Sequence, residues 1–152
     1  MLISDLLKEN QIALDLRGPD GPGAIREVAA LLRDNPAVLS FDDFYAELLA
    51  REQVESTCLG NGIAFPHART DHIKNMVLAV GRSRPGVFFQ GCGETVHLLF
   101  IIGTPKRMAT DYLSVVGGLA RLLKDPDLRE KLLAAPDAAA FIEVIAAGEK
   151  KF

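Results

Sequence analysis

Residues 96–102, which read Val-His-Leu-Leu-Phe-Ile-Ile, constrain the fold more than any other stretch of this sequence. A strand that is almost wholly apolar is expected at the centre of a sheet, where both of its faces are covered. Further strands are predicted over residues 12–14, 63–65 and 76–80. Helical patterns lie before, between and after these strands, so we predict an α/β protein in which helices cover a sheet.

Helices are expected where apolar residues recur at spacings of three and four. The segment at residues 18–23 holds two prolines and three glycines and is expected to be irregular. Ser40 is placed to cap the third helix, with Asp43 as its partner. Turns at residues 85–86 and 91–93 are expected to flank the short apolar segment at residues 87–89. The predicted helices cover residues 2–8, 24–35, 40–52, 112–123, 126–133 and 137–147.

The predicted helix at residues 112–123 carries an apolar stripe that is expected to face the core. It also contains the pair Gly117-Gly118, which close packing of the helix against the sheet would explain. The stripe consists of Leu113, Val116, Leu119, Leu122 and Leu123.

Length and charge balance limit the classes of function. A chain of 152 residues is about one domain long, so residues 1–152 are predicted to form a single domain. With 17 basic and 20 acidic residues, the formal net charge is −3, so the chain lacks the excess of positive charge that is typical of nucleic-acid-binding proteins. The sequence has no run of about 18 apolar residues, and its first ten residues lack a signal-peptide core. We therefore expect a cytoplasmic protein that neither inserts into a membrane nor binds nucleic acid.

Residue spacing gives little support for metal chemistry. The two cysteines, Cys58 and Cys92, lack the paired spacing of a zinc or redox site and are expected to be reduced thiols. The three histidines also lack the spacing of zinc ligands. The sequence therefore predicts neither a metal nor a cofactor.

The stretch from Arg51 to His67 holds the residues that indicate chemistry. Pro66 ends the strand at residues 63–65, which favours delivery of His67 to the edge of the sheet. A neutral imidazole has a free lone pair near neutral pH and can attack phosphorus without a separate base. His67 is therefore the candidate nucleophile; the alternative is a turn histidine with no chemical role.

Groups that suit a phosphate precede this histidine. Gly60 and Gly62 permit positive φ, which could turn backbone N–H groups toward an anion. Ser56 and Thr57 add hydroxyl donors, for which ordinary loop polarity is the alternative. These four residues are the predicted cradle of a phosphoryl group.

Two arginines could neutralise the charge of such a group. The planar guanidinium groups of Arg51 and Arg69 suit phosphoryl oxygens. The alternative for Arg51 is a solvated cation at the end of a helix. The alternative for Arg69 is a solvent-facing charge in a loop. Phosphoryl transfer depends mainly on positioning and on neutralising spread-out charge. A histidine, a guanidinium and several N–H donors would therefore suffice, without metal or nucleotide, if the donor is itself a phosphorylated protein.

The other two histidines are expected to lie outside this site. His72 follows Asp71 in a polar segment and is interpreted as a solvated surface residue, with donor docking as the alternative. His97 lies within the apolar strand and is interpreted as a packed residue with one nitrogen satisfied, with an orienting role at the site as the alternative.

The sequence resembles the fructose/mannitol-class enzyme IIA domains of the bacterial phosphoenolpyruvate:sugar phosphotransferase system, including their stand-alone nitrogen-regulatory relatives. The resemblance covers nearly the whole chain and implies a three-layer α/β/α sandwich with a mixed central sheet. It also implies that His67 is the phosphoacceptor and Arg51 its charge-stabilising partner. The motifs that carry it are Arg51-Glu52, Ser56-Thr57, Gly60-Asn61-Gly62-Ile63-Ala64, Pro66-His67 and the apolar strand before Pro105.

The resemblance implies partners and exposes one departure. The implied phosphoryl donor is the small histidine phosphocarrier protein or its nitrogen-branch paralogue, and the implied acceptor is a regulatory target protein or a sugar permease domain. Many members carry a second histidine where this chain has Tyr112. A tyrosine hydroxyl can donate a hydrogen bond but cannot act as a second imidazole. Tyr112 is therefore expected to line the site and to alter transfer.

We interpret the chain as a phosphoryl-relay protein that acts as a phosphohistidine phosphotransferase on His67. A regulatory, nitrogen-branch role is preferred because no transporter segment accompanies the domain. Two alternatives stay open. One is a IIA-like module that binds partners without being phosphorylated, and the other is the sugar-specific, fructose/mannitol-type IIA component of a permease.

Overall fold

A mixed sheet of six strands forms the middle layer of the protein, whose computed structural model describes residues 2–151. The strand order is β1-β5-β6-β3-β2, and β4 also pairs with β6. The β5–β6 and β2–β3 pairs are antiparallel, whereas β1 is parallel to β5, and β3 and β4 are both parallel to β6. The strands are β1 (Ile12–Ala13), β2 (Cys58–Gly60), β3 (Ile63–Ala64), β4 (His67–Arg69), β5 (Val77–Phe89) and β6 (Glu94–Thr104).

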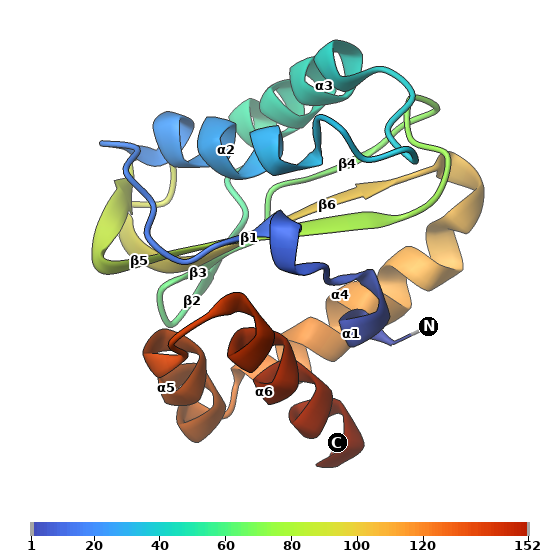
Figure 1. Ribbon diagram of the computed structural model, residues 1–152. Helices are drawn as coiled ribbons and strands as arrows, with labels where there is room; N and C mark the ends of the chain where they lie inside the picture. Colours follow the sequence, from blue (N-terminus) through green and yellow to red (C-terminus); the bar gives the residue numbers. More distant parts are fainter. Residues whose placement is uncertain (1, 152) are drawn as a thin grey trace.

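Helices cover both faces of this sheet, which confirms the predicted three-layer α/β/α sandwich. Helices α2 (Gly21–Ala29) and α3 (Phe41–Val54) lie on one face. Four helices lie on the other face (Figure 1), namely α1 (Ile3–Leu6), α4 (Ala109–Leu123), α5 (Pro126–Ala134) and α6 (Ala138–Lys151). Short 3₁₀ turns are present at Glu9–Gln11, Ala30–Leu32 and Lys106–Met108.

Strand β6 is central and contributes to both hydrophobic cores. Leu98, Phe100 and Ile102 pack under α4 to α6, while Leu99 and Ile101 pack under α2 and α3. All five residues are at most 2% exposed. Side chains alternate between the faces of a strand, so an uninterrupted apolar run supplies both layers at once. The prediction for residues 96–102 is confirmed.

The N-terminal half of the structure corrects two details of the helix predictions. Helix α2 begins at Gly21, inside the segment that was expected to be irregular, because the Asp20 carboxylate accepts the Gly23 N–H at 2.8 Å. Pro22 is tolerated there because the first turn of a helix lacks N–H partners anyway. Ser40 does not cap α3 as predicted; its hydroxyl donates to Asp43 at 2.7 Å.

The turn predicted at Pro85-Gly86 is absent, and β5 runs through it. The register between β5 and β6 shifts between Arg82 and Val87, which identifies a bulge. An irregular residue pair in a bulge tolerates a proline and a glycine with φ of +93°, so these two residues bend the strand without ending it. The predicted turn around Cys92 is confirmed, and it joins β5 to β6.

The predicted apolar stripe of α4 is confirmed at Leu119, Leu122 and Leu123, which are at most 2% exposed, but not at Leu113. Leu113 is 67% exposed, whereas Val115, which lies outside the predicted stripe, is buried. The prediction that Gly117-Gly118 packs closely on the sheet is also wrong. A Cβ on Gly118 would lie 3.3 Å from the Ile3 side chain, so this glycine faces α1.

Cys58 and Cys92 form a disulfide, with their Cα atoms 6.3 Å apart. The expectation of two reduced thiols is therefore wrong. The two residues are 34 positions apart and meet only because the turn between β5 and β6 folds over β2, a contact that local spacing does not encode. In the chain-entropy model, closing a loop of this length stabilises the folded state by about 4 kcal/mol.

Glycine 81 of β5 provides a stability test of the packing between α2 and the sheet. A Cβ at Gly81 would collide with the Val28 side chain and lie 2.8 Å from that of Leu16. We expect Gly81→Ala to lower the free energy of unfolding by about 1–3 kcal/mol, measured by urea denaturation. Gly117→Ala is the matched control, because its Cβ would meet only Arg121 at 3.6 Å. There the better helix propensity should raise stability by about 0.5–1 kcal/mol, and a loss at both positions would contradict this account.

Candidate functional site

A hollow of about 500 Å³ lies between α3, β4 and α4. Strand β4 starts at His67, directly after Pro66, and pairs with the C-terminal end of β6, where His67 is opposite Ile102. His67 therefore lies near the C-terminal end of β6, as the first residue of β4, and is half-buried. The prediction that Pro66 ends the pairing is wrong, because β4 resumes it on β6 directly after this proline. The hollow is lined by Glu47, Ala50, Arg51, His67, Ala68, Arg69 and Tyr112.

The His67 ring is oriented by one backbone contact. Its Nδ1 atom lies 2.9 Å from the Phe65 carbonyl oxygen. A carbonyl oxygen can only accept, so in this contact Nδ1 carries the proton and donates it. The neutral ring then keeps its lone pair on Nε2. The contact thus leaves Nε2 as the ring nitrogen with the free lone pair, a point that the sequence left open.

Arg51 reaches the hollow from the last turn of α3. Its guanidinium lies 3.9 Å from the Glu55 carboxylate, and the two side chains are 41% and 76% exposed. An exposed pair at this spacing contributes little to stability because water screens it. The guanidinium can therefore leave Glu55 for an anion in the hollow at low cost.

Arg69 and Tyr112 complete the polar wall beside His67. The Tyr112 ring lies 5.5 Å from the His67 ring, centroid to centroid, at an interplanar angle of 40°. Burial raises the pKa of Tyr112 above its usual value, and the positive charges of Arg51 and Arg69 partly oppose this shift. The Tyr112 hydroxyl therefore keeps its proton at neutral pH and is available as a hydrogen-bond donor.

Glu47 is a lining residue that sequence reasoning missed. It precedes Arg51 by four positions on α3, so both residues lie on the same face of the helix. That spacing was the available signal. Its carboxylate places a negative charge near the two arginines and would disfavour a bound anion.

Ser56 and Thr57 do not belong to the lining of the hollow. The Thr57 hydroxyl donates to the Glu52 carboxylate at 2.9 Å, and the Thr57 N–H donates to it at 3.1 Å. The Ser56 hydroxyl lies 3.4 Å from the same carboxylate. These groups join the end of α3 to β2 and are not turned toward His67.

Gly60 and Gly62 also lie outside the lining: Gly60 is the last residue of β2, and Gly62 lies in the turn to β3. Both have positive φ, as predicted, and so does Asn61 between them. The Gly62 carbonyl accepts N–H groups of His97 and Leu98 at 2.7 and 3.0 Å. The structure therefore gives the two glycines a place in the sheet and does not bring them to the hollow.

The remaining histidines are placed as expected, outside the hollow. His97 Nδ1 lies 3.0 Å from the Ser83 carbonyl, which confirms a packed ring with one satisfied nitrogen. His72 Nδ1 lies 3.9 Å from the Asp43 carboxylate, with its side chain 40% exposed.

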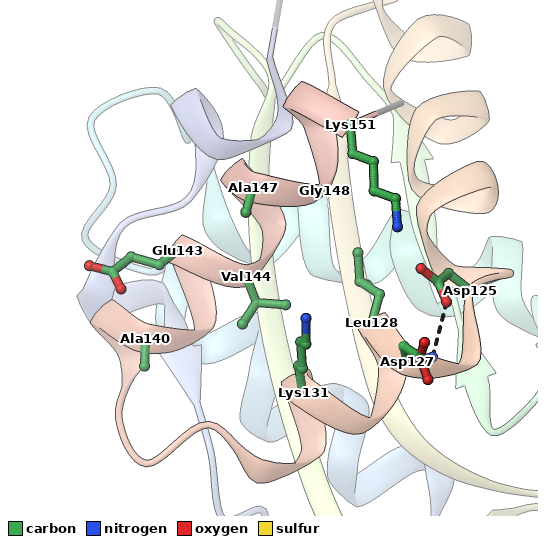
Figure 2. A pocket seen from close by; sticks show the side chains of 10 residues that line it. All are labelled: Asp125, Asp127, Leu128, Lys131, Ala140, Glu143, Val144, Ala147, Gly148 and Lys151. Atoms are coloured by element: carbon green, nitrogen blue, oxygen red, sulfur yellow. Dashed lines mark hydrogen bonds between the residues drawn. The ribbon is translucent and has the colours of Figure 1, made fainter.

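A second hollow, of about 430 Å³, lies between α5 and α6 (Figure 2). Its floor includes Leu128 and Val144, and its rim carries charges of both signs. Asp125, on this rim, is the N-cap of α5, and its carboxylate accepts the Asp127 N–H at 3.0 Å. Its lining contains neither histidine nor arginine, so the hollow beside His67 is the better candidate for phosphoryl chemistry.

Within residues 2–151, no helix is long and apolar enough to cross a bilayer.

Comparisons with known proteins agree with the geometry. The family model "Phosphoenolpyruvate-dependent sugar phosphotransferase system, EIIA 2" matches residues 5–148. The fructose-specific EIIABC component of Bacillus subtilis (strain 168) is 33% identical over 95% of this chain, which spans only 23% of that protein.

Two nitrogen regulatory proteins match over most of both chains. The protein of Bradyrhizobium diazoefficiens is 31% identical over 96% of this chain and 95% of its own. The crystal structure of IIA-Ntr from Neisseria meningitidis superimposes with a TM-score of 0.85 at 30% identity, covering 94% of this chain and 98% of that one. The chain belongs to the EIIA 2 family of the phosphoenolpyruvate-dependent sugar phosphotransferase system.

Proposed function

We propose that this protein accepts a phosphoryl group on Nε2 of His67 from a histidine phosphocarrier protein and passes it on. The observation that carries the proposal is the hydrogen bond from His67 Nδ1 to the Phe65 carbonyl, in a hollow that also holds two arginines. One nitrogen is thereby protonated and fixed, and the other is left as a nucleophile.

In the proposed step, the Nε2 lone pair attacks phosphorus and the N–P bond of the donor phosphohistidine breaks. The donor imidazole leaves as the neutral ring and retains its own N–H, so no external base is needed. The His67 ring gains positive charge as the new N–P bond forms. The Phe65 carbonyl, which accepts from Nδ1–H at 2.9 Å, stabilises that charge.

Charge neutralisation is the task of the two arginines. Arg51 and Arg69 line the same hollow as His67, and their positive charges both act on Tyr112. A phosphoryl group in transfer spreads its negative charge over three oxygens, and fixed positive groups around it lower the barrier. We assign these two guanidinium groups, with the Tyr112 hydroxyl, to the oxygens of the transferred group.

Incubation with a ³²P-labelled phosphohistidine donor tests the proposal. We expect one acid-labile phosphoryl group per chain, which peptide mapping should assign to the peptide that contains His67. Nuclear magnetic resonance of the ¹⁵N-labelled ring should place it on Nε2. Absence of label, or label on another residue, would overturn the proposal.

A regulatory role in the nitrogen branch is the part of this function that we prefer. The structure of IIA-Ntr superimposes on this chain with a TM-score of 0.85 at 30% identity, which supports this choice. Coverage does not separate the two branches, because a fructose-specific EIIA component of Haloferax volcanii also matches over nearly the full length of both chains. The proposed acceptor is then a regulatory target protein, and the proposed location is the cytoplasm, where the donor would be. Tight binding to a sugar permease domain, in preference to any regulatory target, would contradict this choice.

Tyr112 supplies a second test of the geometry. Tyr112→Phe keeps the ring beside His67 and removes the hydroxyl, so we expect transfer to slow about tenfold, the effect of one hydrogen bond to a charged group. Because burial raises the pKa of Tyr112, the hydroxyl is protonated below pH 9 in the native protein. The ratio of wild-type to variant rates should therefore be constant from pH 6 to 9. Equal transfer rates for the wild type and Tyr112→Phe would show that the Tyr112 hydroxyl takes no part in transfer.

The same position tests the alternative that the protein binds partners without being phosphorylated. If the tyrosine suppresses transfer, Tyr112→His should accept the label much faster than the native chain. Our proposal instead expects the native chain to accept the label without that change. Detection of label only in the histidine variant would favour the binding module.

A further inference from the structure

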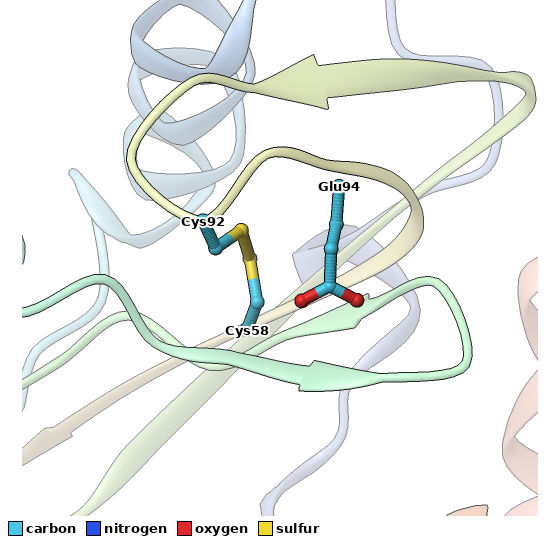
Figure 3. A group of neighbouring side chains, drawn as sticks. All are labelled: Cys58, Cys92 and Glu94. Carbon is cyan, nitrogen blue, oxygen red and sulfur yellow. A yellow bond between two sulfur atoms is a disulfide. The ribbon is translucent and has the colours of Figure 1, made fainter.

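The disulfide between Cys58 and Cys92 is placed where solvent can reach it. Cys58 begins β2 and Cys92 lies in the turn between β5 and β6 (Figure 3). Both residues are half-buried and not sealed in a core. A cytoplasmic location, as proposed above, would expose such a bond to cellular thiols, which keep most protein thiols reduced. The pair is therefore expected to change its state with the redox conditions.

Two hydrogen bonds connect the segment before Cys58 to the candidate nucleophile. The Thr57 carbonyl accepts the Phe65 N–H at 3.0 Å, and the Phe65 carbonyl accepts Nδ1–H of His67 at 2.9 Å. The bond that orients the His67 ring is thus anchored on the residue next to Cys58. Movement of β2 would be transmitted to the ring through the Phe65 peptide units.

The same segment is also connected to the helix that carries Arg51. Thr57 donates both its N–H and its hydroxyl to the carboxylate of Glu52, the neighbour of Arg51. Residues 56–58 therefore join the two sides of the hollow. One side is the end of α3 and the other is the strand that leads to His67.

The turn between β5 and β6 lies directly on this segment. A Cβ on Gly91 would lie 3.2 Å from the Ser56 Cβ, and the Ser56 hydroxyl lies 3.8 Å from the Cys58 sulfur. The loop closed by the disulfide contains His67 but not Arg51. Breaking the bond would release the turn from residues 56–58 and loosen one side of the hollow relative to the other.

Glu94 raises the question of a metal site at the same place. Its carboxylate lies within 4.8 Å of both sulfur atoms (Figure 3). Metal binding requires two separate thiolates, and in this structure the sulfurs are bonded to each other. The observed bond therefore favours redox chemistry over metal binding.

We propose that Cys58 and Cys92 form a reversible redox centre whose state sets the rate of phosphoryl acceptance at His67. The disulfide form holds the hollow in the geometry described here, and the dithiol form accepts the group more slowly, since small misplacements of reacting groups are costly. Reduction by a dithiol breaks the S–S bond and gives two cysteine thiols, while the dithiol becomes a disulfide by loss of two electrons and two protons. The effect on rate depends on the function proposed above; the redox reaction itself does not.

Thiol counting tests the redox reaction without any phosphoryl transfer. The full chain is treated with oxidised glutathione, or with dithiothreitol in the presence of a chelator, and its free thiols are alkylated and counted by mass spectrometry. We expect none after oxidation, two after reduction, and none again after removal of dithiothreitol and return to oxidised glutathione. Two thiols in every condition, or one zinc ion per chain that blocks alkylation, would overturn the redox centre.

Label transfer tests the coupling on the same samples. We expect the oxidised chain to accept the phosphoryl group three to ten times faster than the reduced chain, with full recovery after reoxidation. The variant Cys58→Ser/Cys92→Ser should keep the slow rate whatever the redox treatment, and circular dichroism should show that it is folded. Equal rates for the oxidised and reduced wild type would overturn the coupling. If neither form accepts label, the function proposed above fails, while the thiol counts still decide the redox centre.

Discussion

Replacing His67 with glutamine should abolish phosphoryl acceptance. The amide can occupy the space of the ring but has no basic lone pair, so the N–P bond cannot form. Loss of a nucleophile is the largest single effect expected in a group-transfer site, and we expect a fall of at least about 10⁴-fold, measured as label acquired from a phosphohistidine donor. The side chain is half-buried at the end of the sheet, so the fold should survive.

His72→Gln is the matched control for this loss. His72 is also partly exposed, and its ring lies near Asp43 and outside the hollow. We expect its rate to stay within about twofold of the wild type, because surface substitutions away from a site have small effects. Equal labelling of the wild type and the His67 variant would show that another residue is the acceptor.

Replacing Arg51 with glutamine should slow transfer by about 10² to 10³-fold, the usual effect of removing one group that stabilises transition-state charge. The native protein is expected to lose little stability, because the ion pair of Arg51 with Glu55 is exposed and weak. The expected signature is therefore a large kinetic defect with an unchanged unfolding curve. Single-turnover label transfer and urea denaturation of the same samples measure the two quantities.

Substitutions of two other arginines provide comparisons for the effect of Arg51→Gln. Arg69 lines the hollow but is exposed, so Arg69→Gln should cost less, about tenfold, since water screens its charge. Arg26 lies on the exposed side of α2, and Arg26→Gln should leave the rate unchanged. A uniform loss for all three variants would indicate a general effect of net charge on docking and would contradict a specific role for Arg51.

The parts of the fold that were predicted correctly are those that local pattern determines. The apolar run in β6 had to be covered on both faces, and the helical spacing that follows it located α4 to α6 within a few residues. The sequence also predicts that His67, Arg51, Arg69 and Tyr112 belong to one site, and the structure brings these four residues to one hollow. Residue chemistry and family resemblance selected them, since spacing alone does not show which side chains converge.

The errors concern contacts between segments that are distant in sequence. The disulfide depends on how the β5–β6 turn folds over β2, and Glu52 takes the two hydroxyls that were assigned to phosphate. Arg82 illustrates the same limit. No local pattern marks this arginine as buried, yet it is buried and donates to the carbonyls of Leu14, Leu132 and Ala135. Burial lowers its pKa, and the neighbouring Arg84 adds to that shift.

The segment Gly60-Asn61-Gly62, at the end of β2 and in the turn to β3, limits what the glycine motif of this sequence can indicate about function. Three consecutive residues there have positive φ, which is rare outside glycine and asparagine, so the backbone alone selects these residue types. Descendants that had lost their imidazole would still need this turn in order to fold. The glycine motif alone therefore does not distinguish chains that keep the proposed acceptor His67 from chains that have lost it.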